Sequence, residues 1–293
     1  MRKRLQLDDE NRAERWKSEL KKRMLVSCCM AAVCIIGVLG YKGYEYADRA
    51  VNAGPGQLVA GSVTDSGIYH QLDLMQKEEK KIGAILEHYE EYPEELLDML
   101  TRNMAMLDFV LDYPQKKGQV FADSIGEVTK GEVPLLLQWD ERWGYGDYGT
   151  SSVAVSGCAP TALSMVIAGL TGENRVTPYT VAQYAQENGY YVPGVGTSWD
   201  LMEEGARQFG VEGTKMKLSE HEVMTMLQFG YPIICSMMPG DFTTSGHFIV
   251  LSALEDGKIR VKDPNSAERS EKLWDYETLE SQIKGLWVFI ESK

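Results

Sequence analysis

Residues 156–164 read SGCAPTALS, and they place Cys158 directly in front of an apolar segment that continues to Gly172. Pro160 suits the first turn of a helix, because the N–H group that proline lacks has no helical partner there. The segment therefore predicts a helix that begins near Cys158 and ends between Gly169 and Gly172. Because the N-terminal end of a helix favours a thiolate, the cysteine is either a nucleophile or a small buried side chain.

Two residues downstream favour the nucleophile. His247 opens the apolar segment HFIVLSAL, and Asp263 ends the segment KIRVKD. Both segments are rich in β-branched residues, which is typical of strands, and the turn residues EDGK between them predict a hairpin. Such a hairpin would bring His247 and Asp263 together at one end of a sheet. Cys158, His247 and Asp263 are thus candidates for a nucleophile, a general base and the carboxylate that orients the base.

An acyl-transfer site also needs hydrogen-bond donors for the negatively charged oxygen of its intermediate. The candidates are the backbone N–H of Cys158 and the side-chain amide of Gln138. Cys235 lies inside the apolar segment PIICSMM and is interpreted as structural. The four histidines show no HExxH or comparable spacing, so we predict no metal site and no cofactor. Three tryptophans could line a substrate cleft or pack in the core: Trp139, Trp143 and Trp199.

The order of the expected elements predicts an α+β fold. Helical patterns come first and strands follow, which is typical of a helical half packed on a mainly antiparallel sheet. The expected helices are 158–172, 177–189, 197–210 and 219–230. The expected strands are 133–140, 232–238, 247–254, 258–263 and 285–292.

The net charge of −13 is unevenly distributed along the chain. Residues 1–23 carry nine Lys or Arg against five Asp or Glu, so the rest of the chain is strongly acidic. An acidic surface argues against DNA or RNA as a partner, because binding to nucleic acid needs cationic groups. Residues 24–41 carry no charge and would span about 27 Å as a helix, enough for a bilayer core.

The basic residues that precede this apolar segment predict its orientation. We expect a cytoplasmic tail over 1–23, a transmembrane anchor over 24–41 and the rest of the chain outside the cytoplasm. A cleaved signal peptide and a lipoprotein signal are the alternatives. The small residues near Ala53 lie far beyond the apolar segment, and the lipobox-like residues 25–28 stand at its start rather than its end. We therefore favour the uncleaved anchor.

Three segments follow the predicted anchor. Residues 42–74 include a small, polar, glycine-rich stretch and predict a flexible linker. Residues 75–118 have apolar residues at helical spacing and predict a small helical module. This module could be a spacer, a partner-binding unit or an extension of the core that follows. Residues 130–293 form the expected catalytic domain.

The motifs VPLLLQWDERWG, SGCAPTAL, GTSWD, GHFIVL and KDPNS, in this order, resemble the C39-like papain-fold cysteine peptidases, whose better-known relatives cut double-glycine leader peptides. The resemblance covers residues 133–293. It implies a papain-like fold with Cys158 as nucleophile, His247 as base, Asp263 as orienting residue and Gln138 as oxyanion donor.

These observations together predict a membrane-anchored, extracytoplasmic cysteine peptidase that cleaves a peptide or isopeptide bond. Its partners would be a peptide or protein substrate, cell-wall peptide included, and the membrane through the N-terminal helix. Two alternatives stay open. One is a cell-wall peptide amidase, and the other is a catalytically silent binding protein that keeps the fold at the cell surface.

Overall fold

The structure is a computed structural model that describes residues 67–292. The predicted cytoplasmic tail (1–23), the predicted anchor (24–41) and most of the predicted linker (42–74) lie outside these residues. Within 67–292, none of the helices combines the length and the apolar character needed to cross a membrane.

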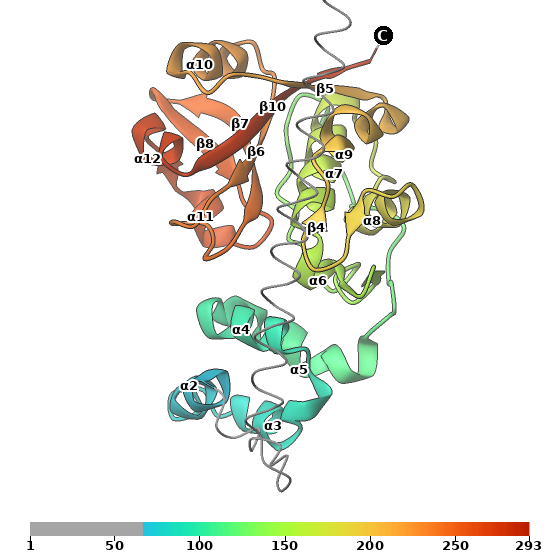
Figure 1. The fold of residues 1–293 in the computed structure, drawn as a ribbon, viewed down its shortest axis with the longest axis vertical. Coiled ribbons are helices and arrows are strands. Elements are labelled where there is room, and N and C mark those ends of the chain that lie inside the picture. The colour runs from blue at the N-terminus through green and yellow to red at the C-terminus, as the bar shows by residue number, and fades with distance from the viewer. Residues whose placement is uncertain (1–66, 293) are drawn as a thin grey trace, which may run out of the picture. The chain divides into compact units, whose positions relative to one another are not determined.

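A six-stranded antiparallel sheet forms the C-terminal half of the described chain (Figure 1). Its strand order is β5-β10-β6-β7-β8-β9, and every neighbouring pair runs antiparallel. The strands are β5 (Val211–Lys215), β6 (Ile233–Met237), β7 (His247–Glu255), β8 (Lys258–Lys262), β9 (Leu273–Trp274) and β10 (Ile283–Glu291). Two short hairpins lie outside this sheet: β1 (Asp147–Tyr148) with β2 (Ser151–Ser152), and β3 (Tyr191–Val192) with β4 (Gly196–Thr197).

Helices cover both faces of the sheet, with α7 on one side and α10 and α12 on the other (Figure 1). Strand β6 shows why: Ile234 is buried in the core under α7, whereas Ile233 and Cys235 are buried in the opposite core. Alternate residues of a strand point to opposite faces, so a strand that is apolar throughout needs cover on both. The helices of this part are α6 (Val153–Ser156), α7 (Cys158–Thr171), α8 (Pro178–Glu187), α9 (Asp200–Glu203), η4 (Gly205–Phe209), α10 (Glu220–Gln228), α11 (Ala267–Glu271) and α12 (Tyr276–Glu280).

The predicted α+β class and antiparallel sheet are confirmed, but two predicted elements differ. Residues 133–140 form no regular strand, although the segment is apolar and Leu136 is buried in the core. A short apolar segment can be buried without joining a sheet, and here Gln138 uses its backbone N–H to bond Pro264 O at 2.7 Å. The long helix expected over 197–210 is instead the short α9 followed by the 3-10 turn η4, which ends at Gly210 with a φ of 77°.

The N-terminal part of the described chain is a group of short helices. They are α2 (Gly67–Met75), α3 (Ile82–Glu87), η2 (Tyr89–Glu91), α4 (Glu94–Arg102), η3 (Met104–Met106) and α5 (Leu107–Lys116). Helix α2 begins inside the segment expected to be flexible, so the linker prediction is wrong for 67–74. Leu72 explains the order of α2, because its side chain is fully buried among the other helices. Met104, at the start of η3, is 39% exposed.

This helical module, residues 67–116, shares one hydrophobic core with residues that lead to Cys158. Leu100 of α4 and Phe109 of α5 are buried together with Tyr145 and with Ala154 of α6. The rings of Phe109 and Tyr145 stack with centroids 4.1 Å apart, and the Tyr145 hydroxyl donates to Phe109 O at 3.2 Å. The module therefore packs as an extension of the core that follows it, one of the three roles left open by the sequence.

Candidate active site

Cys158 is the first residue of α7 and follows a sharp corner. The preceding helix α6 ends at Gly157, whose N–H donates to Val153 O at 2.8 Å. A Cβ atom on Gly157 would collide with that same carbonyl oxygen, so the corner requires glycine. The predicted helix is confirmed, and Gly172 ends it in the left-handed conformation with a φ of 78°. This turn leaves the Cys158 side chain partly exposed at the helix N-terminus.

The body of α7 fixes the position of the sulfur. All residues from Ala159 to Gly169 are buried, and Leu163, Val166 and Ile167 are fully buried in the core that α7 shares with β7. A closely packed helix allows little movement of its first residue.

His247 and Asp263 meet across the β7–β8 hairpin, as predicted. The turn at Asp256 and Gly257 has φ values of 51° and 76°, the two left-handed positions of a tight hairpin. At the other end of the hairpin His247 opens β7, and Asp263 follows β8. His247 Nε2 and Asp263 Oδ1 are 2.7 Å apart, with only 7% and 0% of the two side chains exposed.

The Cys158 side chain is within hydrogen-bonding reach of the His247 ring. Because Nε2 is bound to Asp263, Nδ1 is the nitrogen left for the sulfur. Burial by itself would lower the pKa of His247, but the charge and hydrogen bond of Asp263, together with a hydrogen bond and charge from Cys158, outweigh it and raise the pKa to about 10. The structure thus brings together the three residues that the sequence singled out, and it favours an imidazolium beside the sulfur.

Asp263 has partners on both carboxylate oxygens. Oδ1 also accepts from the Asn265 N–H at 2.8 Å, and Oδ2 accepts from Arg269 Nε at 2.5 Å. Burial alone would raise the pKa of Asp263, but His247 and Arg269 outweigh this effect and lower the pKa. The sequence indicated no role for Asn265, although it lies in the KDPNS motif, or for Arg269, which belongs to no periodic pattern. Because the pKa of Asp263 is lowered, the carboxylate is ionised. Its hydrogen bonds to Asn265 and Arg269 hold it from two directions.

These two pKa shifts predict how the stability depends on pH. The pKa of His247 is higher in the folded protein than its ordinary value, so its stabilising contribution is full below about pH 6.5 and is lost as the pH rises toward 10. The lowered pKa of Asp263 gives a contribution that is present above its ordinary pKa and is lost in acid. We compare the urea midpoint of the parent with that of His247→Gln. We expect the difference between the two midpoints to become smaller as the pH is raised from 6 to 10. A difference that stays constant over this range would contradict the assignment.

Gln138 is buried beside the segment that leads to Cys158. Its Nε2 donates to Ala154 O at 2.6 Å and also lies 3.5 Å from Val155 O, whereas its Oε1 has no partner within the described part of the chain. One N–H of this amide is therefore used by α6, and a role in binding an oxyanion would fall to the other. The position is compatible with the predicted role and does not test it.

The tryptophans have different surroundings. Trp143 is fully buried and its Nε1 donates to Leu137 O, so it is a core residue. Trp199 is half-buried and packs edge-on against Trp287. Trp139 is half-buried and donates to Asn265 O at 3.2 Å, next to the Asp263 loop.

Tyr148 is a neighbour of Cys158 that the sequence did not indicate. Its side chain is fully buried, and its hydroxyl lies 2.7 Å from Thr197 Oγ1. Burial raises the pKa of Tyr148, and the charge of Cys158 acts in the same direction. The phenol therefore stays neutral beside the sulfur.

Cys235 and the remaining histidines are separate from this site. Cys158 and Cys235 are both free thiols, and Cys235 is completely buried in β6, where burial raises its pKa. His88 and His221 are exposed on the surface. Across residues 67–292, no group of three or more His, Cys, Asp or Glu side chains is arranged to hold a metal ion.

The model of the Peptidase_C39 like family matches residues 130–292. Two solved structures are similar to this chain. The peptidase domain of Streptococcus ComA, a bi-functional ABC transporter involved in a quorum-sensing pathway, is 20% identical with a TM-score of 0.39, covering 55% of this chain and 100% of that domain. A protein from Bacillus anthracis, described as a C39-like peptidase, is 17% identical with a TM-score of 0.32, covering 57% of this chain and 99% of that one.

No curated protein matches the sequence. The two structural similarities are too weak to carry an argument of their own. The family model, by contrast, covers more than half of the chain, and it includes Cys158, His247, Asp263 and Gln138. Its range also contains the whole six-stranded sheet and α7. The chain therefore belongs to the Peptidase_C39 like family and has its α+β, papain-like fold.

Proposed function

We propose that this protein is a cysteine peptidase in which Cys158, His247 and Asp263 act as a catalytic triad. The observation that carries the proposal is the buried pair of His247 Nε2 and Asp263 Oδ1 at 2.7 Å, with the Cys158 sulfur next to the same ring. An imidazolium at this place stabilises a thiolate, and the thiolate is the reactive form of cysteine. The raised pKa of His247 supports this ion pair.

The reaction would proceed in two steps. Cys158 Sγ attacks the carbonyl carbon of the substrate amide, and the C–N bond breaks as His247 gives its proton to the leaving amine. Neutral His247 then takes a proton from a water molecule, whose oxygen attacks the thioester and releases the acid and the Cys158 sulfur. Asp263 keeps the ring oriented and stabilises its charged form. The Cys158 N–H and the second N–H of Gln138 are the proposed donors to the negatively charged oxygen.

The proposed location is the outer face of a cell membrane. It rests on the uncharged segment 24–41 and the basic residues before it, which predict an anchor with the following chain outside the cytoplasm. A peptidase placed there would meet secreted, surface or cell-wall peptides, so a peptide or isopeptide bond in such a substrate is the proposed target. A protease-accessibility assay on intact cells tests the orientation.

Cleavage of peptides by the full chain tests the proposed function. The substrate is a mixture of fluorogenic peptides with all residue types at each position, so that no sequence preference has to be assumed. We expect the parent to hydrolyse a subset of the mixture, and Cys158→Ala to hydrolyse none of it. Hydrolysis that survives in Cys158→Ala would contradict the triad. A folded parent with no cleavage and no thiol reactivity would favour the silent binding protein instead.

A further inference from the structure

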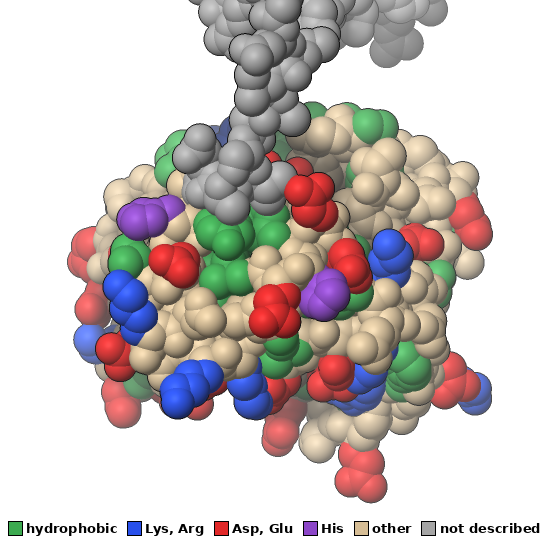
Figure 2. Space-filling view, turned by 90° about the horizontal axis from the view of Figure 1, so that it is seen from below, with side chains coloured by type: hydrophobic (Ala, Val, Ile, Leu, Met, Phe, Trp, Pro, Cys, Tyr) green, Lys and Arg blue, Asp and Glu red, His purple; other side chains and the backbone are tan. Residues whose placement is uncertain are grey.

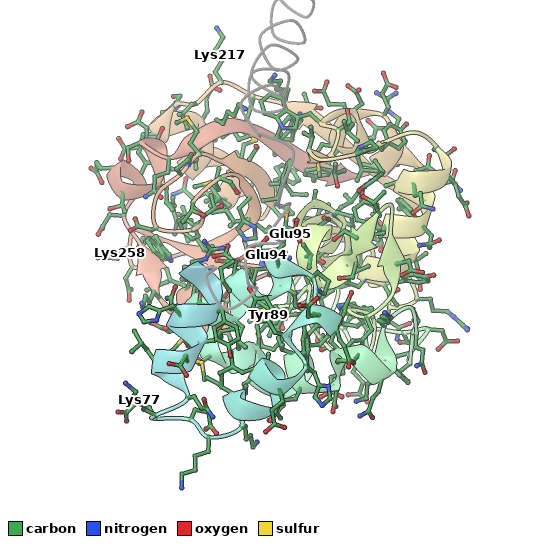
Figure 3. All side chains as sticks on the ribbon, turned by 60° about the horizontal axis from the view of Figure 1, so that its bottom comes forward. Lys77, Tyr89, Glu94, Glu95, Lys217 and Lys258 are labelled. Atoms are coloured by element: carbon green, nitrogen blue, oxygen red, sulfur yellow. The ribbon has the colours of Figure 1, made fainter. Side chains whose placement is uncertain are left out.

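The helical module reaches the two loops that carry His247 and Asp263. Helix α4 begins with Glu94 and Glu95, labelled in Figure 3, and has Arg102 in its last turn, charges that suit the two ends of a helix. At this last turn Arg102 Nη1 donates to Thr244 Oγ1 at 3.1 Å, three residues before His247. The corner of α4 therefore lies against the loop that leads into β7.

Asn103, the next residue, makes the second contact. Its Nδ2 donates to Asn265 O at 2.7 Å, two residues after Asp263. The N–H of the same Asn265 donates to Asp263 Oδ1, the oxygen that is also bound to the His247 ring. Only one residue, Asn265, thus separates Asn103 from the Asp263 carboxylate. Trp139 donates to the same carbonyl at 3.2 Å, a longer bond than that of Asn103.

The other end of the Asn103 amide is anchored in the module. Its Oδ1 accepts from the Ala105 N–H at 3.2 Å and so caps η3. Because the oxygen is bound to the module, the nitrogen is directed to the Asn265 carbonyl. The side chain thereby links the backbone of the module to the backbone of the Asp263 loop.

The helix that leads to this corner, α4, is packed in a buried core. Leu96, Leu97 and Leu100 of α4 are fully buried, in the core that also contains Ala154 of α6. The module therefore contacts the segment before Cys158 as well as the loops beside His247 and Asp263. On the part of its outer face seen in Figure 2, acidic and basic side chains are interspersed, without the uniform charge expected of an electrostatic docking surface.

We propose that Asn103 is a positioning residue of the triad: it holds Asn265, and through Asn265 it keeps the Asp263 carboxylate aligned with the His247 ring. This inference rests on the proposed function, since it concerns the same three residues. It gives the helical module a part in the geometry of the site, at its α4–η3 corner. A module that was only a spacer would have no such part.

The substitution Asn103→Asp in the full chain tests the inference. Aspartate keeps an oxygen for the cap on Ala105, but it places a second oxygen against the Asn265 carbonyl in place of the donor. Asn174→Asp is the matched control, because Asn174 Nδ2 also donates to a backbone oxygen, Gly126 O at 2.9 Å, in a loop outside the site. The readouts are the rate at which iodoacetamide alkylates Cys158 at pH 6, the titration of His247 by NMR, and the urea midpoint.

We expect Asn103→Asp to lower the alkylation rate about 10-fold, with Asn174→Asp unchanged. Because the new carboxylate would itself raise the pKa of His247, the titration is compared in Asn103→Ala, where the lost alignment is expected to lower that pKa. A lower urea midpoint with an unchanged rate and titration would mean that Asn103 is only structural and would overturn the inference. If Asn103→Asp does not fold, Asn103→Ala removes the donor without adding charge, and the same outcomes apply. The proposed function fails separately, when the parent itself reacts no faster than His247→Ala.

Discussion

Replacing Asp263 with asparagine is expected to lower the pKa of His247 from about 10 to below its ordinary value of 6.5. Burial is the largest influence on this ring and favours the neutral form, and the charge of Asp263 is the main influence that opposes it. Asparagine keeps the shape but removes the charge. The ring would then be neutral at pH 7, a change of more than about 1,000-fold in its affinity for a proton.

NMR of the ¹³C-labelled Cε1–H groups measures this change, because the chain has only four histidines. The control is Asp140→Asn, which breaks the ion pair of a half-buried carboxylate with Arg142 and leaves His247 untouched. We expect the His247 signal to titrate near pH 10 in the parent and in the control. A signal that still titrates near pH 10 in Asp263→Asn would show that another group holds the proton.

Replacing either Cys158 or His247 with alanine is expected to lower peptide hydrolysis by about 10⁴-fold. Without the sulfur no thioester can form, and without the ring the sulfur loses the group that stabilises the thiolate and protonates the leaving amine. Because the two residues act as a unit, the double variant should be no slower than the slower single variant. Single-turnover rates on the best peptide of the mixture measure the three losses.

Cys235→Ala is the control for this series. Cys235 is a buried thiol in β6 with no part in the site, so its loss should change the fold's stability and leave the rate unchanged. If the losses of Cys158→Ala and His247→Ala add up in the double variant, the two residues act independently. That result would contradict an ion pair between them.

The parts of the site that depend on local signals could be predicted from the sequence. Pro160 and Gly172 mark the two ends of α7, and the Asp256–Gly257 turn forms the β7–β8 hairpin. Each of these residues acts locally. Proline and glycine set the backbone conformation of their own turn, whatever the rest of the chain packs against. Since His247 and Asp263 stand at matching ends of one hairpin, their meeting followed from the turn between them.

Contacts between distant segments could not be predicted in this way. Asn103 is 162 residues from Asn265, and neither side chain belongs to a hydrophobic period. Arg269 is only six residues from Asp263, but it reaches the carboxylate because α11 turns the chain back on itself. A single polar side chain on a short helix could bond to water or to any of several nearby groups. Only the folded backbone determines which partner it meets.

The two wrong predictions, a strand over 133–140 and a flexible linker over 67–74, have a related cause. Residues 133–140 are as apolar as a strand, yet their backbone bonds to the Pro264 loop instead of to a sheet. The last part of the expected linker contains apolar side chains, and α2 docks on the module through Leu72, which is fully buried, and through Ile68 and Met75, which pack against the same core. In both cases a tertiary partner, which the sequence does not show, determined the structure.

The rate at which iodoacetamide alkylates Cys158 at pH 6 tests the triad most directly. The full chain is labelled, and the peptide that contains Cys158 is quantified by mass spectrometry, so the other four cysteines do not interfere. A thiolate paired with His247 should react at least about 10-fold faster than free cysteine at this pH, and His247→Ala should abolish the difference. Equal rates in the folded parent and in His247→Ala would show that the imidazole does not activate the sulfur, and the proposed triad would be wrong.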